Sequence, residues 1–255
     1  MTVWFLSMLP SLLGTAPFEP AFYWADQFSD VPILGCVIVA AALRLRRSRE
    51  RKERTFWRLF IGGMVGWIAV RGLYVVVPYE DRGVASDLFT DVCYLLGYLC
   101  LMVALELRPD HDPPGFTRVR RVESLGILTF AFLMLSYFTL VPSVFNPEAY
   151  ASWSTSLLLY AVLDVWLIAR ALRLLHTDLA SGWVVPIRLL AAVLVLWFIG
   201  DVMEGLMYLG TIPYVDSGTP ADLLWAMPML LLLFVVRSRE WQDRPGPVMP
   251  AARAT

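Results

Sequence analysis

Five ionisable residues stand inside apolar stretches of this sequence, where a charge is costly unless it finds a partner. They are Arg71, Asp91, Asp164, Asp201 and Glu204. A charged side chain at the centre of a bilayer costs about 2.5–3.5 kcal/mol on insertion scales, so such residues pair with one another or line a water-accessible path. These residue types suit an intramembrane ion pair, a site for a cation or amine, or a proton relay.

Matched spacing in two segments connects Arg71 with Asp201. The segments share one pattern, at a constant offset of 130, and differ in charge at the last position: Arg58, Trp67 and Arg71 in the first, and Arg188, Trp197 and Asp201 in the second. Weaker echoes relate 42–45 to 171–174 and 86–88 to 221–223. The pattern predicts two related halves, with an ion pair between them.

Two interpretations of the ionisable residues remain open. In the first, Arg71 pairs with Asp201 or Asp91 and ties helices together, while Asp87 and Asp222 cap helix N-termini at the outer face. In the second, the carboxylates line a cavity open to the outside that binds a cation or amine or relays protons. The structural interpretation is modestly favoured.

Asp164 is the deepest of the carboxylates, and the sequence shows no partner for it. Three tryptophans, Trp67, Trp197 and Trp225, could line a pocket beside the carboxylates. Aromatic residues at helical spacing more often serve packing or anchor a helix at the membrane interface. Both roles are kept for the tryptophans.

Composition predicts an all-α integral membrane protein. The chain has 255 residues, of which 58% are hydrophobic and 17% charged, and its mean hydropathy is +0.62. A membrane-spanning helix needs about 20 mostly apolar residues. Seven stretches qualify: roughly 29–45, 56–77, 86–107, 123–141, 152–173, 185–209 and 219–236.

Basic residues predict the orientation of these spans. Of the 21 Lys and Arg residues, 19 fall on alternate connections, at 44–58, 108–121, 170–188 and 237–253. Because Lys and Arg near span ends stay on the cytoplasmic side, we expect the N-terminus outside and the C-terminus in the cytoplasm. This result requires an odd number of spans.

The expected organisation is three helices, one connecting helix and three more helices. Residues 1–28 form an outer interfacial segment, 29–236 the membrane domain, and 237–255 a disordered cytoplasmic tail. The repeat halves cover about 29–107 and 152–236, with the linker helix at 123–141. An odd linker makes the repeats parallel, as in some transporters. Gly62 and Gly66 form a small-xxx-small pair that predicts close helix approach.

Several chemistries are disfavoured by what the sequence lacks. His111 and His176 fall on predicted loops, so a haem, copper or di-iron site inside the membrane is not expected. The single lysine, Lys52, lies on a loop, which leaves no amine for a retinal Schiff base. No hydrolase or P-loop motif occurs. We therefore expect no catalytic residue, no metal, no cofactor and no nucleic-acid partner.

Some of the same residues resemble a known family. The run Phe56-Trp57-Arg58-Leu59, then Gly66-Trp67, the stretch 86–89 and the stretch 94–99 resemble the multi-helix input region ahead of GGDEF or histidine-kinase domains in some bacterial sensors. Leu99 stands where that pattern often has proline, and Arg71 departs from an acidic position that Asp201 satisfies. The resemblance implies a membrane input region and carries over no catalytic residue.

The leading hypothesis is a bacterial inner-membrane sensory or regulatory module. It would bind a small ligand or lipid from the outer side and pass a helix rearrangement to a cytoplasmic partner. One alternative is a small-solute or ion-coupled transporter. Another is a structural subunit of a larger membrane complex. Expected partners are membrane lipids, a cytoplasmic signalling protein, a second copy of the chain or a larger complex.

Overall fold

The structure, a computed structural model, describes residues 19–77, 83–110, 154–177, 179–213 and 223–242, together with single positions between 122 and 145. Every element in these residues is helical. The helices are α2 (Glu19–Arg47), α3 (Arg51–Val76), α4 (Val84–Leu107), α7 (Ser154–Leu175), α8 (Ser181–Tyr208) and α9 (Leu223–Gln242).

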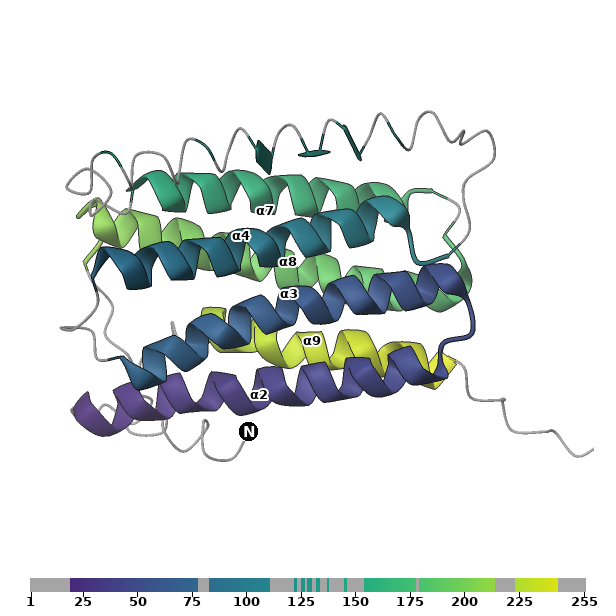
Figure 1. Cartoon of the computed structure of the whole chain (residues 1–255), viewed down its shortest axis with the longest axis horizontal. Coiled ribbons are helices and arrows are strands. Elements are labelled where there is room, and N and C mark those ends of the chain that lie inside the picture. The colour runs from purple at the N-terminus through teal and green to yellow at the C-terminus, as the bar shows by residue number, and fades with distance from the viewer. Residues whose placement is uncertain are drawn as a thin grey trace, which may run out of the picture.

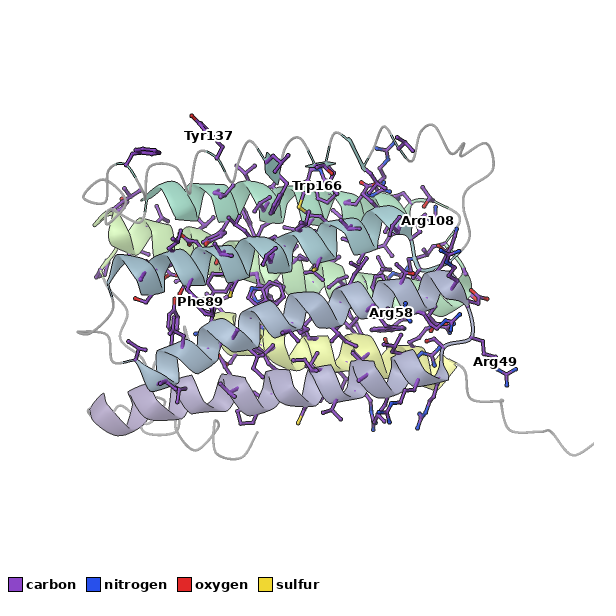
Figure 2. The ribbon with its side chains drawn as sticks, viewed as in Figure 1. Arg49, Arg58, Phe89, Arg108, Tyr137 and Trp166 are labelled. Atoms are coloured by element: carbon purple, nitrogen blue, oxygen red, sulfur yellow. The ribbon has the colours of Figure 1, made fainter. Side chains whose placement is uncertain are left out.

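The helices lie side by side with their long axes roughly parallel (Figure 1). Helix α3 packs against α2 and α4, and α8 packs against α7 and α9. Contacts between α2 and α9, and between α4 and α7, join these two sets. Figure 2 labels Arg49, Arg58 and Arg108 at one end of the bundle, which we call the arginine-rich end, and Phe89 towards the other.

The prediction of seven transmembrane helices in a three-plus-one-plus-three arrangement is wrong. The described residues form six helices, and three of these, α3, α4 and α8, are long and apolar enough to cross a membrane. The sequence count treated each apolar run as a span, although charges enter several of them, such as Asp30 and Arg44 in α2. The odd number of spans that followed from the distribution of basic residues is not seen in the described residues either. The expected helix at 123–141 lies mostly outside the described residues.

The bundle's outer surface is apolar over most of its helices. Large hydrophobic side chains are exposed on α2, α4, α7, α8 and α9, among them Val39, Leu96, Val165, Ile199 and Phe234. Such a surface is unfavourable in water when the patches are extensive. It fits lipid contact, in agreement with the three membrane-length helices.

Helices extend beyond the apolar runs at the arginine-rich end. Helix α2 carries three arginines in its last turn, and α3 begins at Arg51 after a short break. Basic side chains near a helix C-terminus interact favourably with the helix dipole, which favours continuation of α2 to Arg47. Helix α9 likewise continues to Gln242, past position 237, where the sequence predicted a disordered tail. At its other end, α2 begins at Glu19, within the predicted interfacial segment 1–28.

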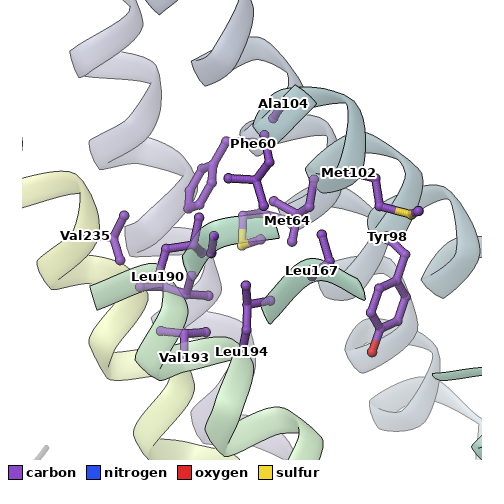
Figure 3. Close-up of a cluster of buried hydrophobic side chains, with 14 of the residues drawn as sticks. Phe60, Met64, Tyr98, Met102, Ala104, Leu167, Leu190, Val193, Leu194 and Val235 are labelled. Atoms are coloured by element: carbon purple, nitrogen blue, oxygen red, sulfur yellow. The ribbon is translucent and has the colours of Figure 1, made fainter. Parts of the chain in front are cut away.

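One hydrophobic core is shared by the described helices. Figure 3 shows part of it, where Phe60 and Met64 of α3 meet Leu167 of α7 and Leu190 and Leu194 of α8. All five side chains are almost completely buried. Lipid is as apolar as leucine, so helices within a membrane associate through close packing rather than through the hydrophobic effect. Close approach of backbones is therefore the feature that matters most.

Glycines permit that approach between α3 and α4. A Cβ atom added at Gly66 would lie 2.6 Å from the Cys93 carbonyl oxygen. A Cβ at Gly63 would lie 3.2 Å from the Gly97 carbonyl oxygen, and one at Gly97 would lie 3.3 Å from that of Gly63. The two backbones are thus in contact, and Gly66, which belongs to the predicted small-residue pair, has the least room.

We predict that Gly66→Ala destabilises the protein by about 1–3 kcal/mol, because the added methyl group must displace the α4 backbone. Gly72→Ala on the same helix is the matched control, since a Cβ there meets nothing within 4 Å. The measurement is the thermal unfolding temperature of both variants in detergent. Equal unfolding temperatures would show that α3 and α4 are farther apart than described.

Candidate functional site

The centre of the bundle holds a buried carboxyl group. Asp164 of α7 has 0% of its surface exposed. The Tyr98 hydroxyl of α4 donates a hydrogen bond of 2.8 Å to Asp164 Oδ1. Asp164 Oδ2 has no hydrogen-bond donor among the described residues. The residue that lacked a partner in the sequence is therefore held by a tyrosine 66 positions away.

Asp201 of α8 completes this site. Its carboxyl group lies within hydrogen-bonding reach of the Asp164 carboxyl and of the Tyr98 hydroxyl. We call these three residues, one each from α4, α7 and α8, the buried acidic group. Within the described part of the chain, neither carboxyl forms an ion pair with an arginine or lysine. Ionised carboxylates only accept hydrogen bonds, so a hydrogen bond between two of them requires a proton on one.

Aromatic rings surround the buried acidic group. The ring centroids of Trp67 and Trp197 are 4.2 Å apart, and the Trp67 ring lies edge-on to Tyr98 at 6.2 Å. The Tyr160 ring stacks on Tyr98 at 5.8 Å with an interplanar angle of 10°. The structure thus brings together two of the three predicted pocket tryptophans. Their rings form part of the low-polarity wall around the carboxyls.

A second tyrosine and aspartate pair connects α4 and α7 in the opposite sense. The Tyr160 hydroxyl of α7 donates a hydrogen bond to Asp91 Oδ1 of α4. Asp91 is 6% exposed. Each of the two helices therefore gives one donor and one acceptor, since Tyr98 on α4 reaches Asp164 on α7. The crossed pairs fix how far one helix can slide or rotate against the other.

Arg71 has an ion partner that the sequence comparison did not name. Its Nε atom lies 3.1 Å from Asp30 Oδ2 of α2, and their side chains are 17% and 4% exposed. Glu204 of α8 lies close enough to Asp201 and Arg71 for both charges to act on its carboxyl group. All five interior residues singled out from the sequence therefore belong to one neighbourhood, with Asp30 added.

Of the remaining predicted residues, Asp87 alone has a described side chain. Asp87 is in the first turn of α4, whose N-cap is Gly83 without a side-chain cap hydrogen bond. Asp222 lies outside the described residues, and Trp225 lies in α9 with a side chain that is not described. Within the described residues, no group of three or more His, Cys, Asp or Glu side chains is placed to hold a metal ion.

A separate polar cluster joins three helices at the arginine-rich end. Glu53 of α3 is 5% exposed. Its Oε1 accepts hydrogen bonds from Arg44 Nε and Nη2 of α2 at 2.9 and 2.6 Å, and from Trp57 Nε1 at 3.4 Å. Arg239 Nε of α9 lies 3.7 Å from the same oxygen. We call Arg44, Glu53, Trp57 and Arg239 the Glu53 cluster.

Neighbouring contacts tie the other helices together at this end. Arg170 of α7 and Glu106 of α4 form an ion pair of 3.0 Å. Arg108, just after α4, pairs with Asp110 at 3.1 Å, and Asp110 Oδ2 accepts the Ala180 backbone N–H before α8. Ion pairs thus join α3 with α2 and α9, and α4 with α7, at the arginine-rich end, and a hydrogen bond from Ala180 ties the start of α8 to the segment after α4.

Three functional residues were missed by the sequence interpretation, and each left a signal. Tyr160 lies four positions before Asp164, which places both on one helix face. Asp30 stands at the start of the apolar stretch 29–45. A rise of about 1.5 Å per residue places it at a depth similar to that of Arg71. The sequence offers little indication that Glu53 is buried and paired. It stands among arginines, in a stretch whose basic residues are typical of those that set membrane topology.

Comparison with protein-family models, with curated proteins and with solved structures finds no match for this chain. The function must therefore be argued from the two polar sites and the helices between them.

We predict that Glu53→Gln lowers the free energy of unfolding by about 3 kcal/mol, because it leaves the buried Arg44 guanidinium without its counter-ion. The side chains of Arg44 and Glu53 are only 7% and 6% exposed, so solvent screens their interaction weakly. Glu50→Gln, at an exposed position three residues earlier, is the control and should change little. Chemical unfolding in detergent measures both variants. Equal stabilities would mean that the cluster is hydrated.

Proposed function

We propose that this chain is a membrane sensory or regulatory module. A small ligand acts at the buried acidic group, and the resulting helix rearrangement reaches a cytoplasmic partner through the arginine-rich end of α9. The observation that carries this proposal is the division of polar contacts into two sites. One couples α4, α7 and α8 inside the bundle, and the other couples α2, α3 and α9 at its end.

Two alternative packings are the requirement for such a module. Packed helix interfaces change between discrete arrangements, because close-packed side chains resist gradual deformation. The Tyr98 to Asp164 hydrogen bond is a suitable control point, since a buried carboxyl that loses its donor must find another partner. A change in occupancy at this bond therefore biases the position of α7 relative to α4.

Helix α9 is the natural output element. It packs along α8, which carries Asp201, and it also contacts α2. Its last part bears Arg239, whose guanidinium carbon lies 5.4 Å above the Trp183 ring centroid of α8. Because basic residues favour the cytoplasmic side of a membrane, the arginine-rich end suits a cytoplasmic partner. A bacterial inner membrane is the location that the resemblance to sensor input regions favours.

An ion-coupled transporter is the second candidate. The contact between the Asp164 and Asp201 carboxyls favours it, because buried carboxylates carry protons or cations in many transporters. A transporter must also expose this site to both sides of the membrane in turn. Solute or proton flux in reconstituted vesicles, abolished by Asp201→Asn, would support transport over sensing.

We predict that Asp201→Asn changes the distance distribution between spin labels at Leu43→Cys on α2 and Phe234→Cys on α9. Both positions are exposed, at 45% and 49%, and both lie near the arginine-rich end. The reason is that the substitution alters the contact with Asp164, and α8 transmits the shift to α9. The measurement is pulsed electron resonance in lipid nanodiscs, after alanine replaces the three native cysteines, Cys36, Cys93 and Cys100.

Glu50→Gln serves as the control for this measurement, since it changes an exposed carboxylate outside both polar sites. It should leave the distribution as in the parent. An unchanged distribution in folded Asp201→Asn protein would contradict sensing through α9, and it would favour a structural subunit if flux were absent as well.

A further inference from the structure

The close approach of the Asp164 and Asp201 carboxyls, the first buried and the second half-buried, sets a charge problem that the surrounding side chains do not solve. Asp164 is fully buried, and its carboxyl lies against that of Asp201. Two unit charges about 4 Å apart repel by on the order of 4 kcal/mol at an effective dielectric constant near 20. Neither has an arginine or lysine ion partner among the described residues, so mutual repulsion would add to the cost of burial.

We propose that Asp164 and Asp201 share one proton, and that this proton is the ligand to which the helix bundle responds. The second half of the proposal rests on the sensory function proposed above. A single proton lowers the charge of the pair to minus one and turns the carboxyl contact into a hydrogen bond. Tyr98 donates to Asp164 Oδ1 and stabilises the remaining negative charge.

Donor chemistry favours a proton over a metal ion. A divalent cation needs several oxygen or nitrogen ligands, whereas the described residues contain no group of three or more His, Cys, Asp or Glu side chains placed for one. Among the described residues, the Tyr98 hydroxyl contacts this pair as a hydrogen-bond donor, which a cation cannot use as a ligand in that role. A proton needs only the two carboxyl oxygens that are already in contact.

The contrast with Asp30 supports this reading. Asp30 is also buried, at 3% exposure, but the Arg71 guanidinium lies 3.1 Å away and supplies the opposite charge. An ion pair of this kind is neutral without a bound proton. Among the described residues, Asp30 thus has an arginine to balance its charge, whereas the pair on α7 and α8 can be balanced by a proton.

Other ionisable groups face the pair from the helices packed around it. They are Asp30 of α2, Arg71 and Tyr74 of α3, Asp91, Tyr94 and Tyr98 of α4, Tyr160 of α7 and Glu204 of α8. Glu204 of α8 lies close enough to Asp201 for the Asp201 charge to act on its carboxyl group. Arg71 acts in the opposite sense, but its charge is offset by Asp30.

Release of the proton gives the signal. When the carboxylic O–H bond breaks, its electron pair stays on the carboxylate and the proton passes to water. The two charges then repel, which separates α7 from α8. Because α9 packs along α8, the movement reaches Arg239 and the Glu53 cluster.

The test is infrared difference spectroscopy of the full chain in lipid nanodiscs as the pH is changed. We expect the carbonyl stretch of a protonated carboxylic acid, shifted by deuterium exchange, which disappears as the pH rises. Asp164→Asn and Asp201→Asn should each abolish it. Asp30→Asn should keep it, because Asp30 pairs with Arg71 and does not belong to the carboxyl pair.

Tyr98→Phe is a second, milder variant, which keeps the proposal testable if the aspartate variants fail to fold. It retains both carboxyls and removes one hydrogen bond, so the carbonyl stretch should persist at a shifted frequency. Its loss in folded protein would overturn the shared proton, as would its absence from the parent at every pH. Replacing choline by sodium at constant pH should leave the stretch unchanged, and its disappearance would show a sodium site instead.

The spin-label distance between α2 and α9 separates the two halves of the proposal. A change in that distance over the same pH range supports the proton as the signal. A carbonyl stretch that titrates while the spin-label distance stays unchanged would overturn the sensory function and leave the shared proton in place. A distance that responds to Asp201→Asn in a protein without the carbonyl stretch would overturn the proton and leave the sensory function in place.

Discussion

The burial of Asp164 constrains the rest of the structure. A carboxyl group inside an apolar bundle cannot be hydrogen-bonded by lipid, so its partners must come from the protein. Tyr98 and Asp201 meet this need, and in doing so they fix the depth and rotation of α4 and α8 against α7. The reciprocal bond from Tyr160 to Asp91 doubles the constraint, because a rotation of about 100°, one residue around a helix, breaks both bonds.

Packing around Asp164 explains where the small residues must be. Trp67 can cover Tyr98 only if α3 approaches α4 closely, and the contact between the two backbones at Gly63, Gly66 and Gly97 provides that approach. The Trp67 ring then meets Trp197 of α8 at 4.2 Å. The glycines of α3 and α4 therefore allow the aromatic rings to pack beside Tyr98, which hydrogen-bonds Asp164 of α7. Helix packing and the polar site depend on each other.

Sequence reasoning located the interior charges but not their partners, for a physical reason. Apolar runs and the helical rise give the depth of a residue such as Arg71 or Asp164, because depth follows from position along one helix. Which helix lies opposite is decided by packing between helices, which has no local signature. The expected partner of Arg71 was Asp201 or Asp91, and the structure adds Asp30 as an ion partner that the sequence did not indicate. The count of seven spans was wrong because apolar composition alone does not distinguish a membrane-length helix from a helix with charged turns.

The strengths of the polar contacts indicate which part of the bundle moves. A tenfold change in proton concentration supplies about 1.4 kcal/mol to a group that titrates completely between two states. That energy is below the roughly 3–5 kcal/mol needed to break a buried ion pair such as Arg44 and Glu53, which are joined at 2.6 Å. The contact of Arg239 with Glu53 is longer, at 3.7 Å, and Arg239 is 17% exposed against 7% for Arg44, so it is the weaker of the two contacts of Glu53. In the proposed mechanism, release of the shared proton therefore moves α9 while α2 and α3 stay joined, and α9 is the element that would carry the change out of the bundle.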